Sequence, residues 1–214
     1  MSEITISAVH TDTLRRMDLR AVETAMPMRA DRAGRFLFER DRLLCLGAGY
    51  LMMQAVKIRR EAEIRLGEYG KPAAPGYPAF SLSHSGLWCI LASGAQGAVG
   101  ADIEALNPAH LDIAPSVYTP GEQAWMSGDP LIRFFQLWTW KESVMKATGL
   151  GLSLEPRRFE VLPFAEGKPV QLLGREWHAR SGRLDGYVFS VCADEPLGPL
   201  TWVEYQATGT VPLA

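Results

Sequence analysis

Residues 137–151 read LWTWKESVMKATGLG, and this stretch places a carboxylate among side chains that a helix would bury. At about 100° per residue, the apolar residues of this region form one stripe with Glu142 in its middle. The stripe contains Leu131, Phe134, Phe135, Trp138 and Met145. An unpaired carboxylate is costly to bury, so we expect Glu142 to be paired, hydrogen-bonded or bound to a metal. Lys146 lies one turn later and could form an ordinary i,i+4 ion pair with Glu142. A purely structural role for Glu142 therefore stays open.

A second acidic pair occurs in residues 98–106, AVGADIEAL, which alternate as a strand does. Asp102 and Glu104 then share one face, about 7 Å apart at their α-carbons. Two acids on one face repel each other unless a cation lies between them. Oxygen ligands without a His or Cys cluster favour magnesium, which keeps positions for water and substrate phosphate. Exposed strands often carry such a pair, but Glu142 as a third ligand strengthens the metal hypothesis.

A third segment, residues 69–86, reads YGKPAAPGYPAFSLSHSG and combines a cation with hydroxyl groups. Its alternation predicts a strand that ends at His84, Ser85 and Gly86, so a histidine and hydroxyl groups lie at the end of the strand. Lys71 precedes a proline and is therefore held in an extended or turn conformation. These groups could hold phosphate oxygens. The alternative is a proline-rich surface loop with a histidine in a turn.

Together the three segments resemble the Sfp-type 4'-phosphopantetheinyl transferases. The matching motifs occur in order as GKP at 70–72 with FSLSHS at 80–85, GADIE at 100–104, and WTWKES at 138–143 followed by Lys146, Gly149 and Gly151. The resemblance covers roughly residues 30–162. It implies that the chain is an enzyme that transfers the 4'-phosphopantetheine arm of coenzyme A to a serine of an apo acyl or peptidyl carrier protein, releasing 3',5'-ADP.

The resemblance also implies a set of site residues. Asp102, Glu104 and Glu142 would hold Mg²⁺, with Mn²⁺ as a possible substitute, against the pyrophosphate of coenzyme A. Glu142 would also be the base for the serine hydroxyl, and Lys146 would neutralise or protonate the leaving group. The coenzyme A contacts would come from Lys71, Ser83 and His84 at phosphates and from Tyr69 and Gly70 beside adenine.

Arginines are concentrated in residues 29–42, RADRAGRFLFERDR, followed by three basic residues at 57–60. Such a run is often a solvated helix face. The resemblance implies that basic residues of this region bind the 3'-phosphate of coenzyme A, and Arg40 and Arg42 are rival candidates for that contact. The same run is the candidate surface for an acidic carrier protein.

Composition is that of an ordinary globular protein. The chain has 214 residues, 47% of them hydrophobic and 21% charged, which is enough for a large core. The net charge of −2 lacks the basic excess of a general nucleic-acid binder. We see no signal segment before residue 10 and no apolar run long enough to span a membrane. We therefore expect a cytoplasmic protein, independent of membranes and nucleic acid and monomeric.

The order of elements predicts an α+β fold, because helices precede runs of strands. We expect helices at 13–24, 31–65 and 131–148, the last closed by Gly149, and strands at 4–9, 79–83, 87–93, 98–104, 158–162, 177–180, 186–193 and 201–207. Thr119 has the spacing of a capping box. The resemblance implies two similar α+β halves related by a pseudo-twofold, residues 1–104 and 105–214, with the active site between them.

Two other functions fit part of the pattern. A magnesium-dependent phosphohydrolase or nuclease would use the same three acids but would leave the GKP and SLSHS segments without a role. A noncatalytic binding protein on a transferase scaffold would be expected to have lost a ligand or the lysine, and all four residues are present.

Overall fold

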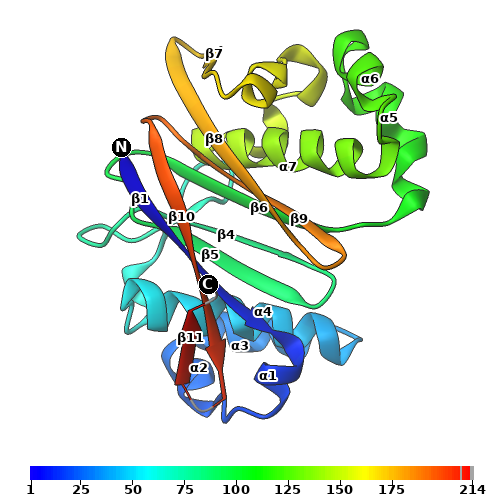
Figure 1. Cartoon of the computed structure of the whole chain (residues 1–214). Coiled ribbons are helices and arrows are strands. Elements are labelled where there is room, and N and C mark those ends of the chain that lie inside the picture. The colour runs from blue at the N-terminus through cyan, green and yellow to red at the C-terminus, as the bar shows by residue number, and fades with distance from the viewer. Residues whose placement is uncertain (208, 213–214) are drawn as a thin grey trace.

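The computed structural model describes residues 1–207 and 209–212, and its mixed α+β architecture confirms the predicted fold class (Figure 1). The helices are α1 (Thr11–Arg15), α2 (Arg20–Ala25), α3 (Pro27–Gly34), α4 (Glu39–Leu51), α5 (Ala114–Val117), α6 (Pro120–Met126) and α7 (Pro130–Thr148). The strands are β1 (Ser2–His10), β2 (Arg65–Leu66), β3 (Pro72–Ala73), β4 (Phe80–Ser85), β5 (Trp88–Ser93), β6 (Val99–Ala105), β7 (Val170–Leu172), β8 (Arg175–Leu184), β9 (Tyr187–Ala193), β10 (Leu197–Gln206) and β11 (Gly209–Pro212).

The strands form two main sheets and a small ribbon. The first sheet has the order β11-β10-β1-β5-β4, the second has the order β6-β9-β8-β7, and β2 pairs with β3. Strand β10 runs parallel to β1, whereas the other pairs are antiparallel. Strands β4 and β6 are therefore the facing edges of two different sheets.

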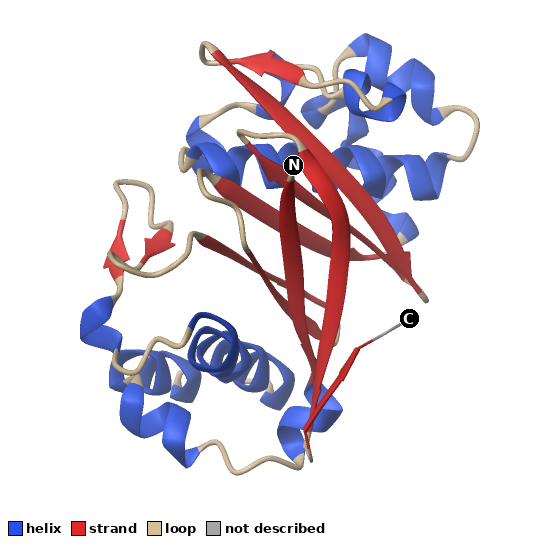
Figure 2. Ribbon diagram, turned by 60° about the vertical axis from the view of Figure 1, so that its left-hand side comes forward, coloured by secondary structure: helices blue, strands red, loops and turns tan. Residues whose placement is uncertain are grey.

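The hydrophobic core is divided into layers by these sheets. One cluster, which includes Leu14, Leu51 and Leu91, lies between helices α1–α4 and the first sheet. A second, which includes Ile6 and Ile103, lies between the two sheets. A third packs helix α7 on the second sheet. The order is helix, sheet, sheet, helix, and Figure 2 shows the strands between two groups of helices.

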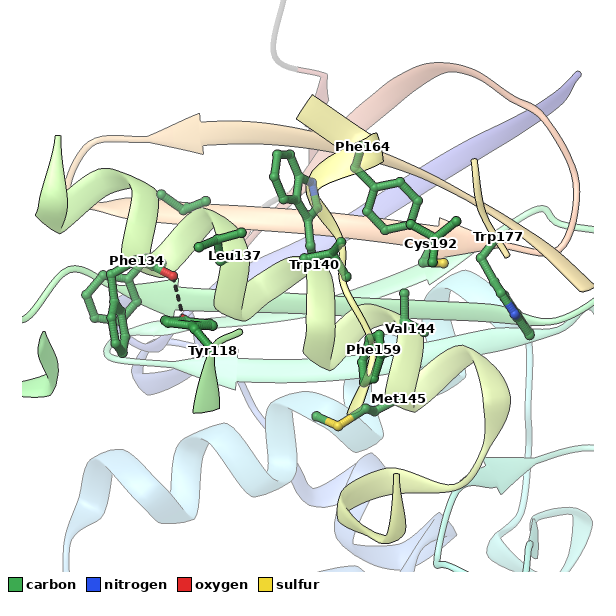
Figure 3. Close-up of a cluster of buried hydrophobic side chains, with 14 of the residues drawn as sticks. Tyr118, Phe134, Leu137, Trp140, Val144, Met145, Phe159, Phe164, Trp177 and Cys192 are labelled. Atoms are coloured by element: carbon green, nitrogen blue, oxygen red, sulfur yellow. Dashed lines mark hydrogen bonds between the residues drawn. The ribbon is translucent and has the colours of Figure 1, made fainter. Parts of the chain in front are cut away.

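Aromatic side chains dominate the third cluster (Figure 3). Tyr118 and Phe134 meet edge to face, and the hydroxyl of Tyr118 donates a hydrogen bond to the Phe134 carbonyl oxygen at 2.7 Å. Trp140 lies against Phe164 from the segment after the helix. This packing fixes α7 against the sheet and leaves another face of the helix for chemistry.

The single helix predicted over residues 31–65 is wrong. Helix α3 ends at Gly34, and Phe38 is extended before α4 begins at Glu39. After α4 a π-helical turn, Met52–Val56, ends at Lys57, whose φ of 70° is left-handed. Helix α3 ends in a tight turn, where the amide of Arg35 donates to the carbonyl oxygens of Arg32 and Ala33.

The strand predicted over residues 158–162 is also wrong. Two short 3-10 turns, Pro156–Arg158 and Leu162–Glu166, occupy this region, and each has a proline among its first two residues. Its backbone instead bonds a buried ion pair. The ammonium of Lys141 donates to the carbonyl oxygens of Pro156 at 2.7 Å and Phe159 at 2.6 Å, and lies 2.9 Å from Oε1 of Glu122. Side-chain partners thus replace the strand ladder.

The division into residues 1–104 and 105–214 stays a prediction, and the topology bears on it in two places. Strand β6 spans the boundary and belongs to the second sheet. Strand β10, near the end of the chain, returns to the first sheet, where Thr201 is paired with Thr5. Across residues 1–207 and 209–212, no helix is long and apolar enough to cross a membrane.

Candidate active site

One face of helix α7 borders a cavity of about 660 Å³. Trp138, Glu142 and Lys146 follow one another at intervals of four residues, so they lie on this face. Asp129 caps the start of the helix, and Gly149 ends it with a φ of 76°, as predicted. The apolar stripe is observed only in part. Phe134, Phe135 and Met145 are buried in the core. The face of the helix that carries Glu142 is half-buried at the cavity wall.

Strand β6 brings two more carboxylates to this cavity, where Asp102 and Glu104 both line the wall. Asp102 is 2% exposed. Gly100 lies directly under α7, because a Cβ atom there would overlap the Ser143 carbonyl oxygen and the Ala147 backbone. Only glycine allows this close approach. The glycine therefore sets how near the acids of β6 come to Glu142 and Lys146.

Lys146 links the two elements. Its ammonium lies 2.7 Å from Oδ1 of Asp102 and donates to Oγ of Ser83 at 2.9 Å. Ser83 in turn donates to the same Asp102 oxygen at 2.7 Å. The other carboxylate oxygen of Asp102, Oδ2, is buried and has no hydrogen-bond partner among the described residues. A buried carboxylate oxygen without a partner is unfavourable, so this atom is available for a cation.

The two glutamates are difficult to ionise in this setting. Burial and the neighbouring Asp102 raise the pKa of Glu142 to about 7, although Lys146 lowers it. Burial and Asp102 also raise the pKa of Glu104 to about 7, against hydrogen bonds from Ser85 and Trp138 and the charge of Lys146. Perturbed acids in one cavity are typical of functional sites.

The remaining predicted residues lie along the same wall. His84 lines the large cavity, and partial burial together with the charges of Lys146 and Arg32 lowers its pKa. Tyr69, Gly70 and Lys71 line an adjoining cavity of about 220 Å³, which Lys146 also borders.

Two of these residues have their polar groups engaged in the protein. The ammonium of Lys71 donates to the carbonyl oxygens of Val99 at 2.9 Å and Ala147 at 3.2 Å, which ties β6 to the end of α7. The Ser83 hydroxyl donates once and accepts twice, from Lys146 and from the Ile103 amide. That is its full hydrogen-bonding capacity. The phosphate contacts predicted for both residues stay predictions.

The structure does not bring Arg40 and Arg42 to the site. Both are exposed, and Arg40 bonds Asp41 at 3.0 Å. Arg29 and Arg32 of α3 line the cavity instead. Their spacing of three residues places them on one helix face, and this was the signal available in the sequence.

Arg29 is held in place by its surroundings. Its Nη1 donates to the carbonyl oxygen of Cys45 at 3.2 Å. Its buried Nε has no hydrogen-bond partner within the described part of the chain. An anion at this end of the cavity would satisfy that donor.

The donor set suits a hard divalent cation, although the carboxylates are not yet gathered around one point. Asp102, Glu104 and Glu142 supply oxygen ligands on one cavity wall, and Oδ2 of Asp102 is unpartnered. As the side chains stand, residues 1–207 and 209–212 contain no group of three His, Cys, Asp or Glu near enough to hold a metal ion.

Comparison with known proteins shows the family of the chain. The family model of the 4'-phosphopantetheinyl transferase superfamily matches residues 98–192, which contain all three acids and Lys146. The chain is 32% identical over 199 residues to the 4'-phosphopantetheinyl transferase Sfp of Bacillus subtilis, covering 84% of this chain and 88% of that protein. It is 35% identical over 162 residues to the transferase ffp of Bacillus subtilis, covering 69% and 71% of the two chains. The transferase AcpT of Escherichia coli is 41% identical over 95 residues, which are 41% of this chain and 49% of that protein. The chain thus belongs to the 4'-phosphopantetheinyl transferase superfamily.

Proposed function

We propose that this chain, a transferase by its family, moves the 4'-phosphopantetheine arm of coenzyme A to a serine of an apo acyl or peptidyl carrier protein. The serine oxygen attacks the β-phosphorus of the coenzyme A pyrophosphate, the bond from that phosphorus to the bridging oxygen breaks, and 3',5'-ADP leaves. The observation that carries the proposal is the single cavity that Asp102, Glu104, Glu142 and Lys146 all line. We also propose that the enzyme works as a cytoplasmic monomer.

Charge orients coenzyme A along the cavity. Arg29 and Arg32 stand at one part of the wall, and the acids with Lys146 stand at another. The 3'-phosphate would lie against the two arginines, with His84 nearby. The adjoining cavity beside Tyr69 and Gly70 would then receive adenine. This assignment replaces Arg40 and Arg42 as the phosphate contacts.

The acids would hold magnesium, or manganese in its place. When bound, the ion neutralises pyrophosphate charge and polarises the phosphorus under attack. Oδ2 of Asp102 is the ligand best prepared for it, because it is buried without a partner. Ionised Glu104 and Glu142 would supply the other protein ligands. Their pKa values are raised first by burial and then by the charge of Asp102, and a bound cation would favour the ionised form of both.

Glu142 and Lys146 have different roles in the reaction: one accepts a proton and the other stabilises negative charge. Glu142, ionised beside the cation, takes the proton of the serine hydroxyl directly or through water. Lys146 lies one turn further along α7, where its ammonium faces the charge that develops on the departing phosphate. The ammonium already donates hydrogen bonds to Asp102 and Ser83, so its position is set before substrate binds.

A transfer assay tests the proposal. The chain is incubated with coenzyme A, magnesium and a panel of apo carrier proteins, and each carrier's intact mass is measured. A carrier that gains one phosphopantetheine, with release of 3',5'-ADP, supports the proposal and identifies the partner. Breakdown of coenzyme A at the same rate without any carrier would instead indicate a phosphohydrolase.

A further inference from the structure

Three serines of strand β4 form a row of hydrogen bonds to the neighbouring edge of β6. Oγ of Ser81 accepts from the amide of Ala101 at 2.9 Å, Oγ of Ser83 from that of Ile103 at 3.4 Å, and Oγ of Ser85 from that of Ala105 at 3.1 Å. The three acceptors are two residues apart, and so are the three donors. We call Ser81, Ser83 and Ser85 the serine row.

The serine row replaces a main-chain ladder at the junction of the two sheets. Strands β4 and β6 are edges of different sheets and are not paired with each other. Buried amides at a sheet edge need partners, and each serine supplies one through its side chain. Alternation along β4 places all three hydroxyls on the side that faces β6. The row therefore fixes the register of β6 relative to β4.

Two members of the serine row also hold carboxylates. Ser83 donates its proton to Oδ1 of Asp102 at 2.7 Å, and Ser85 donates to Oε2 of Glu104 at 2.6 Å. A hydroxyl that has accepted a backbone amide has a fixed oxygen, and its one proton then selects one carboxylate oxygen. For Asp102 this leaves Oδ2 as the oxygen without a partner.

Ser81 provides an internal comparison. It makes the same kind of backbone bond in the same row, but within residues 1–207 and 209–212 its hydroxyl bonds no carboxylate. Ser85 differs from it by the bond to Glu104, by being half-buried rather than buried, and by lying at the other end of the strand, away from the smaller cavity that Ser81 lines. If replacing Ser85 weakens cation binding and replacing Ser81 does not, the hydrogen bond from Ser85 to Glu104 is the cause.

We propose that Ser85 is a positioning residue that presents Glu104 to a divalent cation, with Ser83 doing the same for Asp102. This inference rests on the proposed function, because it assigns these acids to the cation. Groups that hydrogen-bond metal ligands orient them, and their loss commonly weakens metal binding 10- to 100-fold. The same serine side chains would thus join the two sheets and orient the carboxylates of Asp102 and Glu104.

The test compares Ser85→Ala with the matched control Ser81→Ala and the conservative variant Ser85→Thr. Binding of manganese in the presence of coenzyme A is measured by the loss of the free-ion electron paramagnetic resonance signal, and the melting temperature is measured without metal. Both alanine variants are expected to lower the melting temperature, because each removes one bond of the row. Ser85→Ala alone is expected to weaken manganese binding roughly 10-fold, and Ser85→Thr should recover most of that loss.

The outcomes separate the two claims. If wild type binds manganese and Ser85→Ala binds it as Ser81→Ala does, the positioning role is overturned and the proposed function stands. If wild type binds no manganese, the metal assignment of the proposed function fails and the positioning role fails with it. Should Ser85→Ala not fold, Ser85→Cys takes its place, because it keeps the volume and weakens the bond to Glu104.

Discussion

The ammonium of Lys146 lies 2.7 Å from Oδ1 of Asp102 and so joins helix α7 to strand β6 at the wall of the candidate active-site cavity. Asp102 is almost completely buried, and the lysine side chain is 27% exposed. The pair brings one positive charge among three acids, which lowers the cost of holding them close together. It also places the ammonium beside the site where phosphate charge would develop.

Lys146→Ala is expected to lower kcat for transfer about 100-fold while changing the KM for coenzyme A much less. The contact of Lys146 strengthens as the leaving phosphate gains charge, so its loss acts mainly on the chemical step. Steady-state kinetics with a carrier protein measures both constants. Lys168→Ala, at an exposed ion pair, is the control. A large rise in KM with unchanged kcat would assign Lys146 to ground-state binding.

Stability without divalent ions should fall as pH rises from 5 to 8. The pKa of Glu142 is about 7 in the folded chain and about 4.5 for an ordinary glutamate, so the folded state keeps a proton that the unfolded state releases between these values. That contribution is complete below about pH 4.5 and is lost as pH rises through about 7. Urea unfolding of wild type should lose about 2 kcal/mol more than Glu142→Gln over this range. Parallel curves for the two proteins would contradict the raised pKa.

Gly100→Ala should destabilise the fold by at least about 2 kcal/mol, because the new methyl group would overlap the backbone of α7. The helix would have to move away from β6, so transfer activity should fall as well. Gly34→Ala is the matched control, since a Cβ there meets no atom within 4 Å. Thermal unfolding measures both variants. Equal melting temperatures would show that α7 is not tightly seated on β6.

Arg32→Ala should raise the KM for coenzyme A about 10-fold, because a charged hydrogen bond to phosphate is lost. It should also reduce the preference for coenzyme A over dephospho-coenzyme A, which lacks the 3'-phosphate. Arg40→Ala should leave both quantities within about twofold, since Arg40 is exposed and bonded to Asp41. The reverse pattern would return the phosphate contact to Arg40, as the sequence first suggested.

Local signals in the sequence predicted those elements that depend on neighbouring residues. Helix α7, its end at Gly149 and the capping box of Thr119 with Glu122 were predicted and are confirmed. The strands that carry the SLSHS and GADIE motifs were also predicted with nearly correct bounds. Each of these features is marked by the periodicity of its hydrophobic residues or by a capping residue, and both signals are local in the sequence.

Features that depend on distant partners were missed. Lys141 is fully buried against Glu122 and the carbonyl oxygens of the following segment, and no local pattern in the sequence indicates this pairing. The pairing of β10 with β1 joins residues almost 200 positions apart, and no local pattern predicts it. Arg40 and Arg42 follow the break after Gly34 and do not line the cavity that Arg29 and Arg32 border, so their phosphate contact stays a prediction.

The dependence of transfer on divalent metal tests the role of the three carboxylates most directly. Intact mass of a carrier protein is followed over time with coenzyme A, across a magnesium titration and in excess chelator, for wild type and for Asp102→Asn, which keeps the shape of the side chain and removes its charge. We predict transfer by wild type that rises with magnesium and stops in chelator, and at least about 100-fold less transfer by the folded Asp102→Asn protein at every magnesium concentration. Full transfer by wild type in excess chelator, or wild-type rates from Asp102→Asn, would contradict the account.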